Sequence, residues 1–293
     1  MLVSKEKQGE LFIFGEAVLW SLFPVLTILS YSKVAPMVSL GGSAVFASVF
    51  FAILLTVKRK WKELKHPEGL KDAFLTMLIS GIAYYVLYFF GLVYTSAGNA
   101  SIIALTGIFF NYLFFQIWRR ELFPLKHLLG AVLMIVGTLI VLYPKMGEFR
   151  GGELLILLAA SIVPIGNFFQ KRARTKISSE SIMFVRSIGT AVVILALALI
   201  LHDNFHYDDI KGSLWFFAIN GFLLLGLSRI LWIEGIHRIT ITKASALEST
   251  APLFTLFFAW ILLNNKPTMW QILAFIPMFL GVILLGTARK KLK

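Results

Sequence analysis

The chain has 293 residues, of which 58% are hydrophobic and 15% are charged, and its mean hydropathy is +0.82. Soluble domains average about 45–50% apolar and about 25% charged residues, so this composition indicates an integral membrane protein and excludes an ordinary soluble domain. The absence of cysteine excludes disulfides and thiolate chemistry. The formal net charge of +13 fits the basic cytoplasmic loops of a membrane protein better than nucleic-acid binding.

Ten apolar segments follow one another along the chain. They are 11–30, 35–57, 73–95, 97–118, 124–143, 153–170, 178–201, 213–237, 241–263 and 268–287. A transmembrane helix needs about 20 mostly apolar residues, and lipid cannot satisfy exposed backbone groups, so each segment is expected to be a helix. Lys5 and Lys7 precede the first segment without a cleavage site after it, which predicts an uncleaved first helix.

The basic residues divide unequally between the two sides of these ten helices. Of 28 lysines and arginines, 21 fall on the side of the N-terminus, five on the other side, and two inside helices. Because cytoplasmic loops collect basic residues, we expect both termini to be cytoplasmic, in the cell (inner) membrane. The basic run 58–71 is interpreted as an orientation signal, with a lipid headgroup site as the alternative.

The two halves of the chain align when the sequence is shifted by 144 residues. "NASIIALTGIFF" then lies on "KASALESTAPLF", and Gly91 meets Gly235. Each half has five helices, and an odd number inserts the second half upside down. We therefore predict an all-α protein of ten transmembrane helices built as two inverted five-helix repeats, residues 1–148 and 149–293, with a site near the midplane where the halves meet.

This layout resembles the ten-helix EamA branch of the drug/metabolite transporter superfamily over nearly the whole chain. The resemblance is carried by "ASALESTAPLF", by "RRELFPLKHLLGAVLMIVGTLIVL", by "NKPTMWQILAFIPMFLGVILLG" and by Arg186 in the seventh segment. Two departures are Ile108 in the place of Pro252 and Gly42 in the place of Arg186. The resemblance implies a central cavity lined by helices 1, 3, 4, 6, 8 and 9, with helices 5 and 10 at the periphery.

Charged residues inside a membrane are costly and mark candidate functional sites. Glu16, Arg186, Arg229 and Glu248 lie at one depth, roughly 8–12 Å from the cytoplasmic ends of their helices at about 1.5 Å per residue. Two acids and two bases at one level predict pairing across helices. The alternatives are a purely structural ion pair between Glu248 and Arg229, and a gating role for Arg186.

Helical spacing adds candidates that share a face with these charges, and polar or aromatic stripes on other helices. The candidates for substrate binding or coupling are, in chain order, Glu16, Trp20, Tyr84, Tyr85, Tyr88, Asn111, Asn167, Arg186, Arg229, Trp232, Ser245, Glu248 and Pro252. The tyrosines could instead form an interfacial belt, the asparagines could bridge helices, and the small residues near Ser245 could serve packing.

The segment "ITITKASALESTAPLF", residues 239–254, carries a carboxylate and a proline inside an apolar run. Pro252 leaves the Glu248 carbonyl without its usual N–H partner. A free carbonyl beside a carboxylate could hold an ammonium group or a proton.

These residues predict a secondary transporter that exports small metabolites, with amino acids as the first candidates, by alternating access. The alternative within transport is a proton-coupled exporter of drugs or organic cations. An intramembrane enzyme is disfavoured, because HExxH, GxSxG and paired aspartates within the spans are missing, and ATP-driven transport is disfavoured, because GxxxxGK[ST] is missing. A membrane scaffold is the remaining, disfavoured alternative. No catalytic residue, metal or cofactor is expected. The expected partners are a small-molecule substrate and the bilayer, with protons as the candidate coupling ion, and monomer and homodimer remain open.

Overall fold

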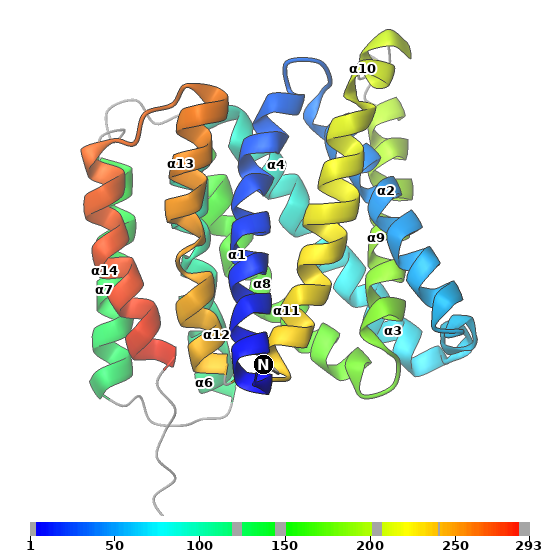
Figure 1. The fold of residues 1–293 in the computed structure, drawn as a ribbon, viewed down its shortest axis with the longest axis horizontal. Coiled ribbons are helices and arrows are strands. Elements are labelled where there is room, and N and C mark those ends of the chain that lie inside the picture. Colours follow the sequence, from blue (N-terminus) through cyan, green and yellow to red (C-terminus); the bar gives the residue numbers. More distant parts are fainter. Residues whose placement is uncertain (1–3, 119–124, 144–150, 201–206, 240, 287–293) are drawn as a thin grey trace, which may run out of the picture.

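The computed structural model describes residues 4–118, 125–143, 151–200, 207–239 and 241–286 (Figure 1). Within these ranges the secondary structure is helical and contains no strand. Nine helical stretches of the described chain are long and apolar enough to cross a membrane, and a shorter apolar helix, 269–285, follows them. The protein is therefore an all-α integral membrane protein, as its composition predicts.

Six spans are single α-helices. They are α1 (Lys5–Ser30), α2 (Pro36–Val57), α7 (Leu125–Leu142), α8 (Gly152–Arg174), α9 (Ser179–Ile200) and α14 (Met269–Gly286). The short 3₁₀ helix η1 (Trp61–Lys65) lies in the loop after α2. These boundaries agree within a few residues with the apolar segments of the sequence, except that α1 begins earlier because Ser4 caps it through the Lys7 N–H.

The other four spans are interrupted, which the apolar pattern did not predict. The third span joins α3 (Pro67–Thr76), the π-helix η2 (Met77–Ala83) and α4 (Tyr84–Tyr94), and the eighth joins α10 (Tyr207–Ala218), the π-helix η4 (Ile219–Leu227) and α11 (Ser228–Ile236). The fourth span breaks between α5 (Ala97–Ala104) and α6 (Thr106–Trp118), and the ninth between α12 (Ile241–Glu248) and α13 (Ala251–Leu263). Pro252 accounts for the break in the ninth span. In the fourth span Ile108 replaces that proline, and tighter turns interrupt the α-helix instead, with the Leu105 N–H bonded to the Ile102 carbonyl.

The interruptions recur at nearly the same spacing as the sequence repeat. Shifting α5 by 144 residues gives the bounds of α12, and shifting α7 gives those of α14. The same shift places η2 inside η4. Close contacts follow it too: Gly137 of α7 packs on Met278 of α14, while Gly281 of α14 packs on Met134 of α7. The two halves of the chain thus share their irregularities as well as their helices.

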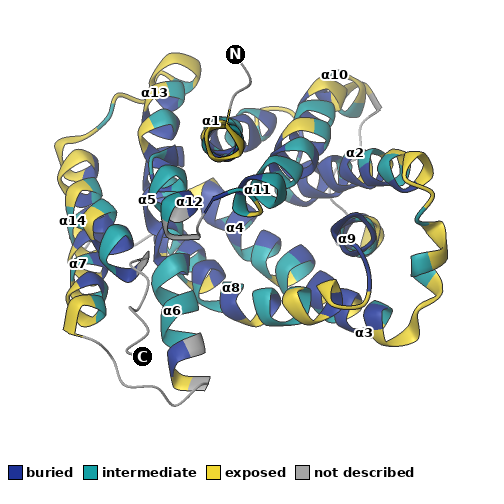
Figure 2. Ribbon diagram, turned by 60° about the horizontal axis from the view of Figure 1, so that its bottom comes forward, coloured by how far each residue is buried: buried dark blue, intermediate teal, exposed yellow. Residues whose placement is uncertain are grey.

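Helices from the two halves lie side by side. The halves meet where α2 packs on α9, α7 on α14, α4 on α8 and α1 on α11. In Figure 1 the pair α7 and α14 forms one edge of the molecule, and α1 lies centrally. Figure 2 shows exposed residues on the outward side of α7 and α14. The exposed apolar residues of these two helices include Leu128, Leu139, Ile272 and Leu280. Exposed apolar side chains at this depth suit contact with lipid, so α7 and α14 are peripheral, as the family resemblance implied.

The beginning of α1 and the end of α14 lie at the same edge of the bundle (Figure 1). A chain that crosses the membrane an even number of times has both ends on the same side. The cytoplasmic assignment of this edge still depends on the distribution of basic residues and stays a prediction.

Candidate functional site

A buried ion pair lies in the centre of the bundle. Glu16 of α1 is 0% exposed, and its Oε1 lies 4.0 Å from Nη1 of Arg229 on α11. The Arg229 guanidinium carbon also lies 3.8 Å from the ring centroid of Trp20, one helical turn after Glu16. Both Glu16 oxygens and Arg229 Nε are buried and have no hydrogen-bond partner among the described residues. Buried polar atoms are normally satisfied, so these orphaned atoms point to a function beyond helix packing.

Glu248 lies at the same level as Glu16. Lys243 of α12 forms an ion pair with α1, and Thr255 of α13 donates a hydrogen bond of 3.0 Å to the Ser21 carbonyl of α1. Glu248 lies between these two contacts on its own span, as Glu16 does on α1. Glu248 is within electrostatic range of both Glu16 and Arg229. The break after α12 thus ends the helix at the residue whose carboxylate approaches this group.

A small cavity of about 80 Å³ adjoins Glu248. Its walls come from the first, third, fourth and ninth spans, which are four of the six helices that the resemblance assigned to the cavity. Its lining includes Trp20, Tyr88, Glu248, Pro252 and Thr255. The cavity is therefore apolar and aromatic on most sides and carries one carboxylate.

The three predicted tyrosines form one aromatic wall with α1. The Tyr84 ring lies 5.1 Å from that of Tyr85 and 5.7 Å from that of Tyr88. Phe23 of α1 meets Tyr85 and Tyr88 at 5.9 Å each and stacks on Trp20 at 4.7 Å. The tyrosines face the interior of the bundle, not a membrane interface.

Arg186 of α9 adjoins this wall without joining the acids. Its Nη2 donates a hydrogen bond of 2.8 Å to the Tyr85 hydroxyl, and its guanidinium lies 5.1 Å from the Tyr85 ring. Its Nη1 contacts the sulfur of Met183. In the part of the chain that the structure describes, Arg186 makes no ion pair. The expected layer of four charges therefore becomes a group of Glu16, Arg229 and Glu248, with Arg186 one tyrosine away.

The remaining candidates lie apart from this group. Asn167 of α8 donates a hydrogen bond of 2.9 Å to Asn111 of α6, so the two asparagines bridge helices. Trp232 packs on a cluster that contains Ile13 and Ala244, further along α11. Ser245 belongs to α12, and its side chain lies outside the described residues.

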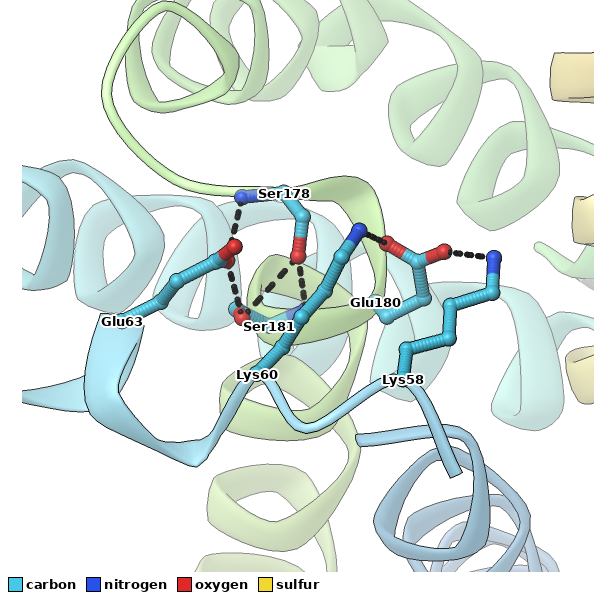
Figure 3. Close-up of polar contacts among 6 residues, drawn as sticks. All are labelled: Lys58, Lys60, Glu63, Ser178, Glu180 and Ser181. Atoms are coloured by element: carbon cyan, nitrogen blue, oxygen red, sulfur yellow. Dashed lines mark hydrogen bonds and ion pairs between the residues drawn. The ribbon is translucent and has the colours of Figure 1, made fainter. Parts of the chain in front are cut away.

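A polar cluster at the edge where α1 begins was not predicted (Figure 3). It joins the loop after α2 to the beginning of α9. Lys58 and Lys60 contact the two oxygens of Glu180, the latter at 3.1 Å. Glu63 accepts hydrogen bonds of 2.7 Å from the Ser178 N–H and from the Ser181 hydroxyl. The sequence interpretation of run 58–71 as an orientation signal overlooked Glu63, one of the two acids in that run.

The environment of Glu63 favours its charged form. Partial burial raises the pKa of Glu63, but the hydrogen bonds from Ser178 and Ser181, together with the charge of Lys60, lower it by more. The pKa of Glu63 therefore lies below its usual value.

Two further ion pairs extend this connection between the halves. Arg172 of α8 holds Asp72 of α3 with two hydrogen bonds, of 2.8 and 2.5 Å. Lys176 pairs with Glu68 at 2.6 Å. Both pairs connect the third span with the end of the sixth.

The opposite edge of the bundle holds a second polar network. The buried Glu153 of α8 accepts hydrogen bonds from Thr95 at 2.6 Å and from Asn99 at 3.2 Å, and Gln271 of α14 donates to Asn99 at 2.7 Å. A crevice of about 620 Å³ lies against Asn99 and Gln271. This crevice is larger than the central cavity, but Asn99 and Gln271 in its wall are bonded to one another. Among the described residues, the charged side chains with buried atoms that lack a hydrogen-bond partner are Glu16 and Arg229, so the central group is the candidate site.

The fold and this site define a class. The protein is a multi-pass membrane protein whose paired half-bundles enclose charged and aromatic groups, with no cluster among the described residues arranged to hold a metal ion.

The chain belongs to the EamA-like transporter family, which matches residues 7–143 and 150–287. It is 22% identical over 276 residues to the uncharacterized transporter YoaV of Bacillus subtilis, covering 93% of this chain and 94% of that protein. An uncharacterized transporter of Methanothermobacter thermautotrophicus is 29% identical over 220 residues, 72% of this chain and 63% of its own. One crystal structure shares the fold with a TM-score of 0.68 at 19% identity, over 95% of this chain and 96% of its own. The protein is a membrane transporter, and its substrate is a small molecule.

Proposed function

We propose that this transporter exports small metabolites that carry an ammonium group, with amino acids as the first candidates. Export would proceed by alternating access between two inverted repeats, residues 1–148 and 149–293, about the central group of Glu16, Arg229 and Glu248. The observation that carries the proposal is the set of buried, unsatisfied polar atoms on Glu16 and Arg229 between the two halves. A site near the midplane of paired repeats is the usual plan of secondary transporters.

The chemistry of the central group suits such a substrate. Glu248, at the end of the broken helix, offers a carboxylate to an ammonium group at the wall of the cavity. Arg229 offers the hydrogen of its unbonded Nε to a carboxylate. Trp20 and the tyrosines supply an aromatic wall for an apolar side chain. A metabolite with both charges and an apolar part would satisfy all three.

A cation without a carboxylate is the second candidate substrate. Arg186 bonds to Tyr85 and pairs with neither acid, so the central group holds two carboxylates and one guanidinium. That imbalance favours a cationic drug or other organic cation.

In the proposed mechanism, the polar contacts between the halves at one edge of the bundle form a gate. The polar cluster of Figure 3 and the pairs Asp72–Arg172 and Glu68–Lys176 join the halves at the proposed cytoplasmic edge. These contacts must separate when the site opens to that side. The protein would lie in the cell (inner) membrane with both ends in the cytoplasm.

Counterflow in proteoliposomes tests the function. Vesicles preloaded with one metabolite of a panel should exchange it for the labelled compound, and the panel should contain amino acids, other amines and organic cations. Glu248→Gln and Arg229→Ala should each lower specific exchange at least tenfold, since each removes a charged partner worth about 1.5–3 kcal/mol. Glu234→Gln, on the helix of Arg229 but in an exposed pair with Arg238, is the matched control. Full exchange by both site variants would contradict the proposal.

A further inference from the structure

The crevice of about 620 Å³ beside Asn99 and Gln271 has no part in the proposed transport group. It lies at the edge of the bundle opposite the beginning of α1. Its walls come from the first turn of α5, the end of α7, the second half of α13 and the beginning of α14, and the connection between α13 and α14 forms its rim. Sites for small molecules have volumes of roughly 300–1,000 Å³, so the crevice can hold a ligand of that size.

The inner wall of the crevice is apolar. It includes Val141, Leu256 and Ala259, and all three are buried. Trp270 also lines the crevice and is 40% exposed, and its ring lies 4.9 Å from that of Tyr143. Tryptophan and tyrosine at the ends of membrane spans are typical of the boundary between hydrocarbon and headgroups. The wall therefore suits an apolar chain, and the rim lies at the depth expected for a lipid headgroup.

The rim offers hydrogen-bond donors and a positive charge. Among the described residues, the side chains of Asn264, Asn265 and Lys266 have no hydrogen-bond or ion-pair partner. Ser96 Oγ accepts two hydrogen bonds within the protein, of 3.1 and 3.2 Å, so its own hydrogen is left to be donated. The described lining contains no acid. Several donors around one cation favour an anion with more than one acceptor oxygen.

The rim is held in place at both ends. The Asn265 N–H bonds to the Ala259 carbonyl at 3.1 Å, and Asn264 takes the left-handed conformation that ends α13. At the beginning of α14, the side chains of Thr268 and Gln271 each accept a hydrogen bond from the backbone N–H of the other, at 3.3 and 2.9 Å. Because the rim is already ordered, a ligand loses little binding free energy in ordering it.

We propose that this crevice binds an anionic phospholipid from the leaflet at this edge of the bundle. The phosphate contacts Lys266 and accepts hydrogen bonds from the Ser96 hydroxyl and the free asparagine amides, while an acyl chain lies against the apolar wall. Basic pockets between membrane helices are suited to anionic lipid headgroups. The same two helices, α13 and α14, expose Ile261 and Leu273, which favours a ligand that is already in the bilayer over a soluble anion.

A lipid in this crevice connects the two halves of the chain. It contacts α5 and α7 of the first half and α13 and α14 of the second, and it touches neither Glu16 nor Arg229. A ligand that binds the folded protein alone raises its stability. The bound lipid therefore stabilises the packing of the halves at this edge, whichever substrate the protein transports.

Native mass spectrometry of the purified protein, titrated with phosphatidylglycerol, tests the site. Lys266→Ala should weaken binding of the first lipid about fivefold, the usual effect of one basic residue beside an anionic headgroup, and Lys266→Glu should weaken it further. Lys266→Arg, which keeps the charge, should restore most of the affinity. Lys211→Ala is the matched control, because Lys211 is an exposed lysine on α10 at the same edge. Since Lys266 is exposed as well, none of these changes disturbs the core.

Two further measurements separate a lipid site from other sources of binding. Phosphatidylglycerol should raise the midpoint of thermal unfolding of the wild type in detergent, and it should raise that of Lys266→Glu much less. Glycerol 3-phosphate, which has the phosphate without the chains, should compete only weakly. Equal losses of affinity in Lys266→Ala and Lys211→Ala, or unchanged binding by Lys266→Glu, would overturn the proposal. Glycerol 3-phosphate that binds as tightly as the lipid would also overturn it, in favour of a soluble anion.

Discussion

Glu63 connects the loop after α2 to the first turn of α9, and it does so with two hydrogen bonds from the second half of the chain. The Ser178 N–H and the Ser181 hydroxyl both donate to its Oε2. A carboxylate at the beginning of a helix also interacts favourably with the helix dipole. A single side chain thus links two halves at one edge of the bundle.

This contact makes stability depend on pH. The pKa of Glu63 is lowered in the folded protein, so its contribution is complete above the unfolded pKa and is lost as the pH falls through the folded pKa. We expect Glu63→Gln to lower the free energy of unfolding by about 1 kcal/mol at neutral pH and by less at acidic pH. Thermal unfolding in detergent, followed by tryptophan fluorescence, measures the effect of the substitution at neutral and at acidic pH. Lys65→Gln, on the same short helix, is the control, and an equal effect of Glu63→Gln at both pH values would refute this role.

The sequence predicted which residues lie together where their depth in the membrane determines their neighbours. Glu16, Arg229 and Glu248 were placed together because each costs free energy in lipid unless it is paired or hydrated. Arg186 lies at the predicted depth but bonds to Tyr85. The contacts of Glu63 could not be predicted, since apolar periodicity does not say which loop of one half meets which loop of the other.

At the scale of helices, close packing of α7 on α14 depends on glycine. A Cβ on Gly130 would lie 2.9 Å from the Gly281 carbonyl oxygen, and one on Gly281 would lie 2.7 Å from that of Gly130. Gly137 packs on Met278 in the same interface. Small residues let membrane helices approach until their backbones touch.

We expect Gly281→Leu to destabilise the protein by about 1–3 kcal/mol, the usual effect of overpacking. The added side chain must push α14 away from Gly130 and Met134. The midpoint of thermal unfolding in detergent should fall accordingly. Leu280→Ile, at the preceding residue, which is 47% exposed, should have little effect. An unchanged midpoint for Gly281→Leu would mean that these helices are less closely packed than described.

The interrupted spans show where sequence reasoning was incomplete. The length of an apolar run predicts a crossing because the bilayer has a fixed thickness. Whether the helix inside it is continuous depends on local turns and on packing against neighbours. Pro252 predicts the break beside Glu248, but no residue type in the sequence predicts the break at Leu105 or the two π-helices.

At the scale of the whole molecule, orientation in the membrane can be tested with lysines. We expect an impermeant amine reagent, applied to intact cells, to modify Lys211 and to spare Lys62, because the first lies at the proposed outer edge and the second at the cytoplasmic one. Both side chains are exposed, so folding does not protect either of them. Peptide mass spectrometry after labelling gives the ratio of modified Lys211 to modified Lys62. Labelling of permeabilised cells, in which both lysines are accessible, is the control. Modification of Lys62 in intact cells would reverse the orientation.

The two halves of the chain pack against each other through equivalent helices, α2 on α9 and α7 on α14. Both halves belong to one chain, so a substitution in one half is not repeated in the other. Glu16 occupies the position that Ala160 has in the second half, and Pro252 the position that Ile108 has in the first. Two separate copies of one five-helix peptide would carry every charged group twice. Fusion into one chain therefore permits an odd number of charged groups, two acids and one base, at the centre.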